Sequence, residues 1–515
     1  MKKYVLRAVL VYVLLLLYGT CNAEQIYNIK NYGILPNGEA IDAKLASLTL
    51  EVSRKGGGVI LFDNGIYIFD LALTTDGTPT GGVRLYRNVT YRGNNNTILK
   101  VKASTEGFHS MFGTADNSVE NVVFENLTFD TYIGTNNRNT NDYRLAIALH
   151  WCKNITIRNC KFIHDIGTID TRYSHKQEDK NIGEYGVDGL IVENCIFEAR
   201  LLKESGYRDI TSFGICAQNV IIRNNRFYVP GSIKKRQNKF YPNCCIELQG
   251  RDMWIYGNEF NDFSNAIDFT TSDTFAKCRN INIYDNRFYT YRGVALWCGY
   301  GQYVKGLNIS RNYFKHTFDN EDKRVTGTKG SIMLVSHPTD SYNGSYLDIL
   351  INGNEFDRRN ENDFLTKKKY EDWIKDAQHK TDEKSGYYFE EYYSTIDLGG
   401  VSKIRDNIFI VGNVFIGGVF PCIYVGGRNI STNHYLIGNE FIDCCFNSNY
   451  GVISLNNNFD GVEIKRNKVI TSNKAHNAEL YKINMRERLL NDKTSNLIQD
   501  VSVSNNDTVY TSKSL

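Results

Sequence analysis

A phrase of nine residues with alternating apolar and polar positions recurs along most of the chain. Asn, Asp or Gly comes first, apolar residues follow at the second and fourth positions, and the seventh and ninth positions are usually Asn and Phe. Neighbouring copies start 26 to 59 residues apart, and alternation inside each copy is typical of β-strands. A repeat of this length predicts a β-solenoid to which each copy adds one coil. The copies begin at Asn121, Asn154, Gly189, Asn219, Asp252, Asn280, Gly306, Asp348, Asn407, Asn433 and Gly461.

The seventh and ninth positions predict two columns of side chains inside the solenoid, because stacked coils bring equivalent residues to about 4.8 Å from one another. Asn side chains in such a column hydrogen-bond from coil to coil, so we interpret them as a structural ladder and not as ligands or glycosylation sites. The aromatic column is Phe129, Phe162, Phe197, Phe227, Phe260, Phe288, Phe314, Phe356, Phe415 and Phe441. The amide column is Asn225, Asn258, Asn286, Asn312, Asn354, Asn413, Asn439 and Asn467, with Cys160 and Cys195 at the same position in earlier coils.

A second, shorter strand is predicted between the copies. The first and third residues of this strand are expected to point inward. The middle residue and the residue two positions after it are expected to point outward and build an exposed sheet face. These strands are Ile147–Leu149, Ile246–Leu248, Ile267–Phe269, Val294–Leu296, Ile332–Leu334, Ile396–Leu398 and Ile423–Val425.

The start of the chain has the pattern of a secretory signal. Lys2, Lys3 and Arg7 precede an apolar run that ends in small residues at Ala23. We therefore expect a secreted or periplasmic protein; a surface lipoprotein acylated at Cys21 is the alternative. No later stretch reaches the roughly 20 apolar residues of a transmembrane helix.

Both ends of a solenoid need a cover, and the sequence predicts one helix at each. Ile41, Leu45, Leu48 and Val52 have helical spacing, and 478–490 is a second helical pattern. Insertions in the repeat are expected to form the walls of a cleft. The predicted segments are a signal peptide over 1–23, an N-terminal cap with the first strands over 24–87, a parallel β-helix over 88–470 with insertions at 174–188, 315–329 and 357–393, and a C-terminal cap over 471–515.

Charge and cysteine content narrow the class of protein. With 60 Lys and Arg against 57 Asp and Glu, the chain lacks the basic excess of proteins that bind nucleic acids or anionic membranes, so no nucleic-acid partner is expected. Beyond Cys21 there are eleven cysteines, an odd number that intramolecular disulfides cannot fully pair. No Cys-x-x-Cys motif occurs, so we expect buried thiols and no structural zinc site.

The N-terminal segments Tyr27–Gly33, Gly56–Phe69 and Asn88–Leu99, together with the repeat, resemble the pectate lyase-like superfamily (pectin lyase fold) of right-handed parallel β-helices. The resemblance covers nearly all of the chain beyond the signal. It implies an all-β solenoid and a secreted, polysaccharide-active enzyme whose substrate lies along the outer sheet face. The polygalacturonase motifs Asn-Thr-Asp, Asp-Asp, Gly-His-Gly and Arg-Ile-Lys are all missing from the sequence, so that branch's mechanism does not carry over.

Two acidic residues are predicted to share the outward column on neighbouring coils. Glu247 and Asp268 are the middle residues of consecutive short strands, so their Cα atoms should lie about 4.8 Å apart. Two carboxylates at that distance do not ionise independently, and this arrangement suits the acid and the nucleophile of a retaining glycosidase. Asp397 lies three coils further on, too far to join them. The alternative interpretation is that alternation simply requires a polar residue at both positions.

Other residues near this pair suit a sugar polymer. Trp297 is a candidate stacking platform, and His150 and Gln249 are candidate hydrogen-bonding groups for hydroxyls. Asp170 and Arg172 offer a second place for the site. A basic loop at 231–243 would favour an acidic glycan.

Three functions stay open from the sequence. A glycoside hydrolase that uses Glu247 and Asp268 would need no cofactor. A polysaccharide lyase would hold Ca²⁺ with the same carboxylates and use Arg251 or Arg172 as its base on a uronate-containing glycan. A non-catalytic glycan-binding protein is the third possibility. In each case a monomer is expected.

Overall fold

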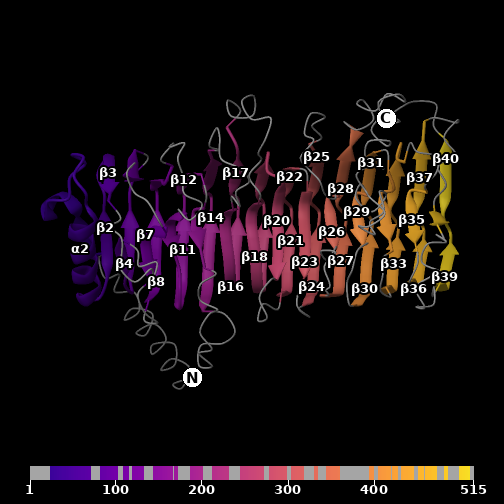
Figure 1. Cartoon of the computed structure of the whole chain (residues 1–515), viewed down its shortest axis with the longest axis horizontal. Coiled ribbons are helices and arrows are strands. Elements are labelled where there is room, and N and C mark those ends of the chain that lie inside the picture. Colours follow the sequence, from indigo (N-terminus) through magenta and orange to yellow (C-terminus); the bar gives the residue numbers. More distant parts are fainter. Residues whose placement is uncertain are drawn as a thin grey trace, which may run out of the picture.

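The computed structural model is an elongated solenoid of parallel strands (Figure 1). Each coil has three strands, which lie on a first, second and third face in chain order, and every pairing between coils is parallel. The structure describes residues 24–70, 82–94, 96–102, 108–114, 119–132, 143–165, 167–171, 186–200, 211–230, 244–271, 278–290, 292–298, 303–317, 330–334, 344–359, 394–398, 404–418, 420–426, 431–445, 451–456, 459–472, 481–484 and 498–510.

The first face carries the short strands that the sequence predicted between the copies of the phrase. Two strands of this face, β16 and β18, continue without a break onto the second face. The described members are β4 (Val83–Leu85), β7 (Phe108–Thr114), β10 (Tyr143–Ala148), β13 (Ile169–Asp170), β16 (Thr211–Arg223), β18 (Cys244–Tyr256), β20 (Asn265–Thr271), β23 (Arg292–Cys298), β26 (Ile332–Leu334), β29 (Ile396–Leu398), β32 (Ile423–Val425), β35 (Ile453–Asn456) and β38 (Tyr481–Asn484).

The second face carries the first part of each phrase. Its strands hydrogen-bond along the whole described solenoid, from the pair β1 and β2 to the pair β36 and β39. They are β1 (Ile26–Asn28), β2 (Gly58–Leu61), β5 (Val89–Arg92), β8 (Val119–Glu125), β11 (Cys152–Arg158), β14 (Val187–Glu193), β21 (Cys278–Tyr284), β24 (Tyr303–Ser310), β27 (Ser345–Asn352), β30 (Ile404–Val411), β33 (Ser431–Ile437), β36 (Phe459–Lys465) and β39 (Ile498–Ser504).

The third face is a separate sheet that begins after each Asn turn. Its strands start next to the ladder residue and contain the Phe column. They are β3 (Gly65–Phe69), β6 (Thr97–Val101), β9 (Thr128–Asp130), β12 (Lys161–His164), β15 (Ile196–Ala199), β17 (Arg226–Tyr228), β19 (Glu259–Asn261), β22 (Arg287–Thr290), β25 (Tyr313–His316), β28 (Glu355–Arg358), β31 (Val414–Gly417), β34 (Glu440–Ile442), β37 (Lys468–Thr471) and β40 (Asp507–Tyr510).

The first and sixth positions of the phrase have left-handed backbone in all eleven copies. The φ angles are 53° to 79° at the first position and 52° to 66° at the sixth. Asn, Asp and Gly adopt this conformation at the lowest cost, which explains their recurrence at the first position. Arg311 is an exception at the sixth position, where its guanidinium forms two hydrogen bonds of 2.9 Å with the carboxylate of Asp285 on the preceding coil.

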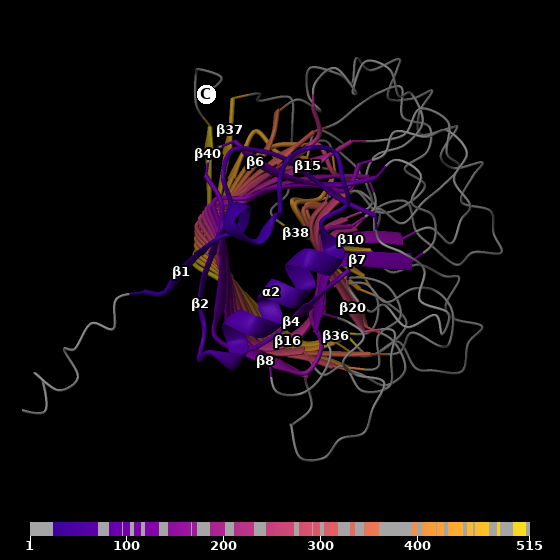
Figure 2. The same cartoon turned by 90° about the vertical axis from the view of Figure 1, so that its left-hand side faces the viewer.

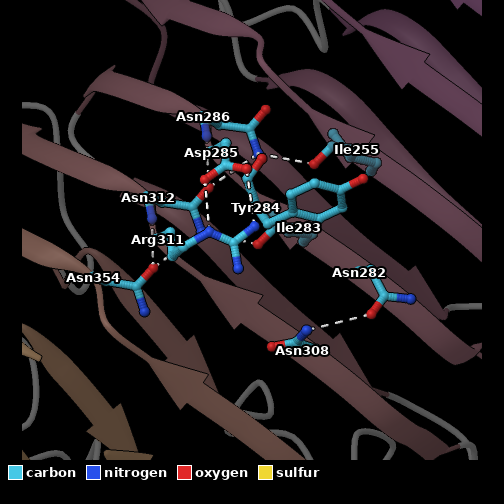
Figure 3. A network of polar contacts seen from close by, with 10 residues as sticks. All are labelled: Ile255, Asn282, Ile283, Tyr284, Asp285, Asn286, Asn308, Arg311, Asn312 and Asn354. Carbon is cyan, nitrogen blue, oxygen red and sulfur yellow. Dashed lines mark hydrogen bonds and ion pairs between the residues drawn. The ribbon is translucent and has the colours of Figure 1, made fainter. Parts of the chain in front are cut away.

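The predicted amide ladder is confirmed. The Oδ1 atom of Asn286 accepts hydrogen bonds from the backbone N (2.9 Å) and Nδ2 (3.0 Å) of Asn258. Its own Nδ2 donates to the carbonyl of Ile255 and to Oδ1 of Asn312 (Figure 3). The same pattern repeats from Asn225 onward and continues to Asn506, one coil beyond the predicted column.

The predicted Phe column is also confirmed. From Phe129 to Phe441 consecutive rings stack with centroids 4.4 to 5.0 Å apart and interplanar angles of 4° to 15°. Buried cysteines join this core, and the ten whose side chains are described are free thiols. Their burial fits the expectation of core thiols.

One helix lies across the N-terminal end of the solenoid (Figure 2). This helix, α2 (Asp42–Arg54), buries Leu45, Leu48 and Val52 and follows the short 3₁₀ turn η1 (Ile29–Tyr32). None of the helices within the described ranges has the length and apolar character needed to cross a membrane.

The predicted C-terminal helix is wrong where the structure describes it. Tyr481–Asn484 is the strand β38, which pairs with β35, and β39 and β40 extend the sheets past residue 470. Pairing with an existing sheet edge outweighs the local helical pattern. The signal segment 1–23 and most of the three predicted insertions, at 174–185, 318–329 and 360–393, lie outside the described residues.

We predict that Asn286→Ala lowers the free energy of unfolding by about 2 to 4 kcal/mol, because the backbone N of Asn258 and the carbonyl of Ile255 lose their ladder partners inside the core. Denaturant titration measures this change. The matched control is Asn282→Ala, three positions before the left-handed Asp285 and on the outer side of β21, which should cost under roughly 0.5 kcal/mol. Equal effects of the two substitutions would contradict a structural ladder.

Candidate functional site

The first face brings the two predicted carboxylates into register. Glu247 on β18 pairs with Asp268 on β20, and the same column continues through Ala295 and Met333 to Asp397. Adjacent parallel strands lie about 4.8 Å apart, so the two acids are neighbours and Asp397 is three coils away. The register predicted from the sequence is therefore confirmed.

The expected exposure of this column is wrong. Asp268 is only 5% exposed, Asp397 1% and Asp170 0%, while Glu247 is half-buried. Gln249, in the next outward column, is 3% exposed. Alternation predicts to which side of a sheet a side chain points, but it does not predict whether that side is open to solvent. The candidate site is thus a buried carboxyl next to a partly accessible one.

The two oxygens of Asp268 have different surroundings. Oδ2 accepts a hydrogen bond of 2.6 Å from Nδ2 of Asn265, whereas Oδ1 is buried and has no hydrogen-bond partner in the described part of the chain. Arg292, half-buried on β23, donates from Nη1 to Oδ1 of Asn265 at 3.1 Å. The carboxyl is therefore held by Asn265 through Oδ2, while Oδ1 is buried.

Burial raises the pKa of Asp268 to about 7, and the neighbouring charge of Glu247 adds to that rise. The hydrogen bond from Asn265, the positive charge of Arg292 and the thiol of Cys244 oppose it and lower the pKa. Asp268 therefore keeps its proton in mildly acidic solution and can act as an acid.

Gln249 and His150 occupy the next outward column of the first face. Gln249 follows Glu247 on β18, and its Oε1 is buried without a hydrogen-bond partner among the described residues. The backbone N of His150 donates to Oγ1 of Thr114. Burial lowers the pKa of His150, and the nearby Asp170 partly offsets this effect. A neutral imidazole and an amide are thus available on this side of the sheet.

Arg251 is not brought together with the carboxylate pair. It lies at the bend of β18 between the first and second faces, next to Gly250, where an added Cβ would be 2.0 Å from the carbonyl oxygen of Ala217 on β16. Nε and Nη2 of Arg251 donate to Oε1 of Gln218 at 2.9 and 2.6 Å. This arrangement does not support Arg251 as the base of a lyase, because its guanidinium is held by Gln218 on the preceding coil.

Two predicted site residues, Trp297 and Arg172, have side chains that the structure does not describe. Trp297 lies on β23 in register with Thr270, but its side chain lies outside the described residues. Arg172 and the basic loop 231–243 also lie outside them. Within the described ranges no cluster of three or more His, Cys, Asp or Glu residues that could hold a metal ion is found.

Asn265 and Arg292 are site residues that were not predicted from the sequence. Asn265 precedes Asp268 by three positions, and in a regular strand such residues point to opposite sides. Alternation therefore predicts no contact between them. The available signal was indirect, namely that Asn265 and Arg292 stand in register at the start of consecutive first-face strands.

No family model matches the chain, and no curated protein matches its sequence. Among solved structures, it is similar to the tailspike protein of E. coli bacteriophage HK620 in complex with a pentasaccharide, at 13% identity and a TM-score of 0.61 over 94% of this chain and 78% of that one. A mutant of this tailspike in complex with a hexasaccharide gives 11% identity and a TM-score of 0.58, covering 93% and 80% of the two chains.

The A-module of the mannuronan C-5 epimerase AlgE6 of Azotobacter vinelandii is similar at 13% identity and a TM-score of 0.50, over 94% of this chain and 99% of that one. Such low identities establish the fold alone. They support the right-handed parallel β-helix, and the narrower resemblance to pectate lyase-like proteins stays a prediction.

We predict that Asp268→Asn stabilises the protein relative to the wild type as the pH rises from 5 to 8. The folded-state pKa of Asp268 is above the ordinary value, so the stability that its buried neutral form contributes is present at low pH and is lost as the pH rises through about 7. The amide variant has no proton to lose. Thermal unfolding at several pH values measures the difference.

Glu198→Gln is the control for that titration. Lys161, Tyr228 and Arg200 hydrogen-bond to Glu198, and against the opposing effect of burial they lower its pKa to about 2. Its contribution to stability is lost only as the pH falls toward that value, so the cost of this substitution should be constant from pH 5 to 8. A constant effect of Asp268→Asn over the same range would contradict a carboxyl that titrates near neutrality.

Proposed function

We propose that this protein is a carbohydrate-active enzyme that hydrolyses glycosidic bonds of a polysaccharide, with Asp268 as the general acid and Glu247 as the nucleophile. The observation that carries the proposal is the in-register pair on β18 and β20, in which one carboxyl is buried with a pKa of about 7 and an oxygen without a partner among the described residues. Glycosidases need such a division, with one protonated and one ionised carboxyl.

The spacing of the pair favours a particular stereochemical course. The Cα atoms of residues in register on adjacent strands lie about 5 Å apart, which allows their carboxyl groups the roughly 5 Å separation of retaining enzymes, whereas inverting enzymes leave room for a water between their carboxyl groups. Asp268 would protonate the departing sugar oxygen through Oδ1 while Glu247 attacks the anomeric carbon. The accessible member of the pair, half-buried Glu247, is the one that must reach this carbon.

The structural neighbours support the choice of substrate class. The HK620 tailspike structures contain bound oligosaccharides, and the A-module belongs to an enzyme of mannuronan. A substrate that lies along the first face of this solenoid would run past Gln249 and His150, whose amide and imidazole suit sugar hydroxyls.

We predict that Glu247→Gln and Asp268→Asn each lower kcat by about 10²- to 10⁴-fold on the polysaccharide that the wild type cleaves. A panel of neutral and acidic polysaccharides identifies that substrate, and NMR of the first product should show retained anomeric configuration. Wild-type activity should fall as the pH rises through about 7, because the acid loses its proton.

The matched control is Asp397→Asn, an acid in the same column three coils away, which should change kcat by less than a few-fold. A product with an unsaturated, ultraviolet-absorbing end would show a lyase and overturn the hydrolase assignment. Binding of a glycan without any cleavage would favour a non-catalytic protein.

A further inference from the structure

The residues around Asp268 point to a role for two side chains that do not themselves reach a substrate. We infer that Asn265 and Arg292 form a positioning relay that fixes which oxygen of Asp268 carries the acidic proton. This inference rests on the proposed function for its purpose, but its geometry is independent of the reaction. Asn265 and Asp268 lie on β20, and Arg292 stands in register with Asn265 on β23.

The direction of each hydrogen bond in the relay is fixed by chemistry. A guanidinium has only donors, so the 3.1 Å contact with Nη1 of Arg292 requires the oxygen of the Asn265 amide to face Arg292. The amide nitrogen must then face Asp268. Its contact of 2.6 Å with Oδ2 makes this carboxyl oxygen an acceptor. Arg292 thus determines the orientation of an amide that would otherwise be free to flip.

An oxygen that accepts a hydrogen bond from an N–H in this way is disfavoured as the site of the proton. The proton of neutral Asp268 therefore resides on Oδ1, the oxygen with no hydrogen-bond partner in the described part of the chain. In the proposed reaction the Oδ1–H bond breaks, the proton passes to the leaving sugar oxygen, and its electron pair stays on the carboxylate. Asn265 then stabilises that carboxylate through Oδ2.

The two described strands on either side of Asp268, β18 and β23, both contribute to its titration. From β18 it is faced by the charge of Glu247 and by the buried thiols of Cys244 and Cys245, and from β23 by Arg292. Burial raises the pKa of both thiols, so they stay neutral near pH 7. Loss of the amide of Asn265 removes a group that lowers the pKa of Asp268, so the titration should move to higher pH.

The test is Asn265→Ala, with the wild type and Asn261→Ala measured in parallel. Asn261 is a close match because its Nδ2 donates to Oε1 of Glu259 at 2.7 Å, on the third face and away from the site. For each protein, thermal unfolding across pH 4 to 9 is compared with that of the same protein carrying Asp268→Asn. The difference falls with rising pH above the pKa of an unfolded aspartate and levels off at the pKa of folded Asp268. The pH at which it levels off therefore gives the titration midpoint of folded Asp268, with no substrate present.

We expect the midpoint to rise by about one pH unit in Asn265→Ala and to stay unchanged in Asn261→Ala. Because Asn265 is buried, Arg292→Gln at a half-buried position provides a second variant and should move the midpoint in the same direction. On a cleaved polysaccharide, the alkaline limb of kcat should shift with the midpoint, an effect that a merely structural role would not produce.

The outcomes separate the relay from the proposed function. Midpoints of Asn265→Ala and Arg292→Gln that coincide with the wild type would overturn the relay, even if Glu247 and Asp268 prove essential for cleavage. Midpoints that shift in a protein that cleaves no polysaccharide would support the relay and overturn the hydrolase.

Discussion

The register between coils, fixed by two left-handed corner residues in each repeat and by one buried Asn in every repeat from Asn225 onward, is the constraint on which the rest of the structure depends. The ladder bond from Asn354 to Asn413 joins residues 59 positions apart in the chain, yet it has the same 2.9 and 3.0 Å geometry as the bond from Asn286 to Asn312, 26 positions apart. The geometry of the ladder is therefore independent of the length of chain between two coils. A slip of one residue would turn every side chain of a strand to the other side of its sheet.

The candidate site uses this register at some cost in stability. The column that places Glu247 beside Asp268 also forces a carboxyl into a buried position, where its charged form is disfavoured. The stacked Phe rings and the amide ladder belong to other parts of the same coil, so the buried carboxyl does not disturb them and the stability that they provide offsets this cost. A group that reduces stability in its charged form is characteristic of functional sites, where activity and stability compete.

The inner columns and the pairing of Glu247 with Asp268 could be predicted from the sequence, because both follow from a repeat whose period is visible in the letters. What could not be predicted was set by contacts between strands and by the bends. Alternation indicated neither the burial of Asp268 nor its contact with Asn265. It also gave no sign of the bend at Gly250, beyond which the structure places Arg251. The helical pattern around Tyr481 yielded to pairing with β35, since a free sheet edge is a non-local partner that local propensity does not include.

The separation of roles within each coil explains how such a scaffold can carry chemistry. Positions that need a particular backbone or a particular buried side chain, such as Asp285, Asn286 and Phe288, lie around the turn from the second to the third face. The acids lie on the first face, where the outward position requires only a side chain that the sheet can hold. Residues there can change without loss of a ladder bond or a stacked ring, so successive coils offer a row of evenly spaced positions. Two acids on adjacent coils obtain their Cα separation from the strand spacing itself. The remaining requirement, which of the two keeps its proton, is met by the burial of Asp268, while the amide of Asn265 decides which oxygen of that carboxyl carries the proton.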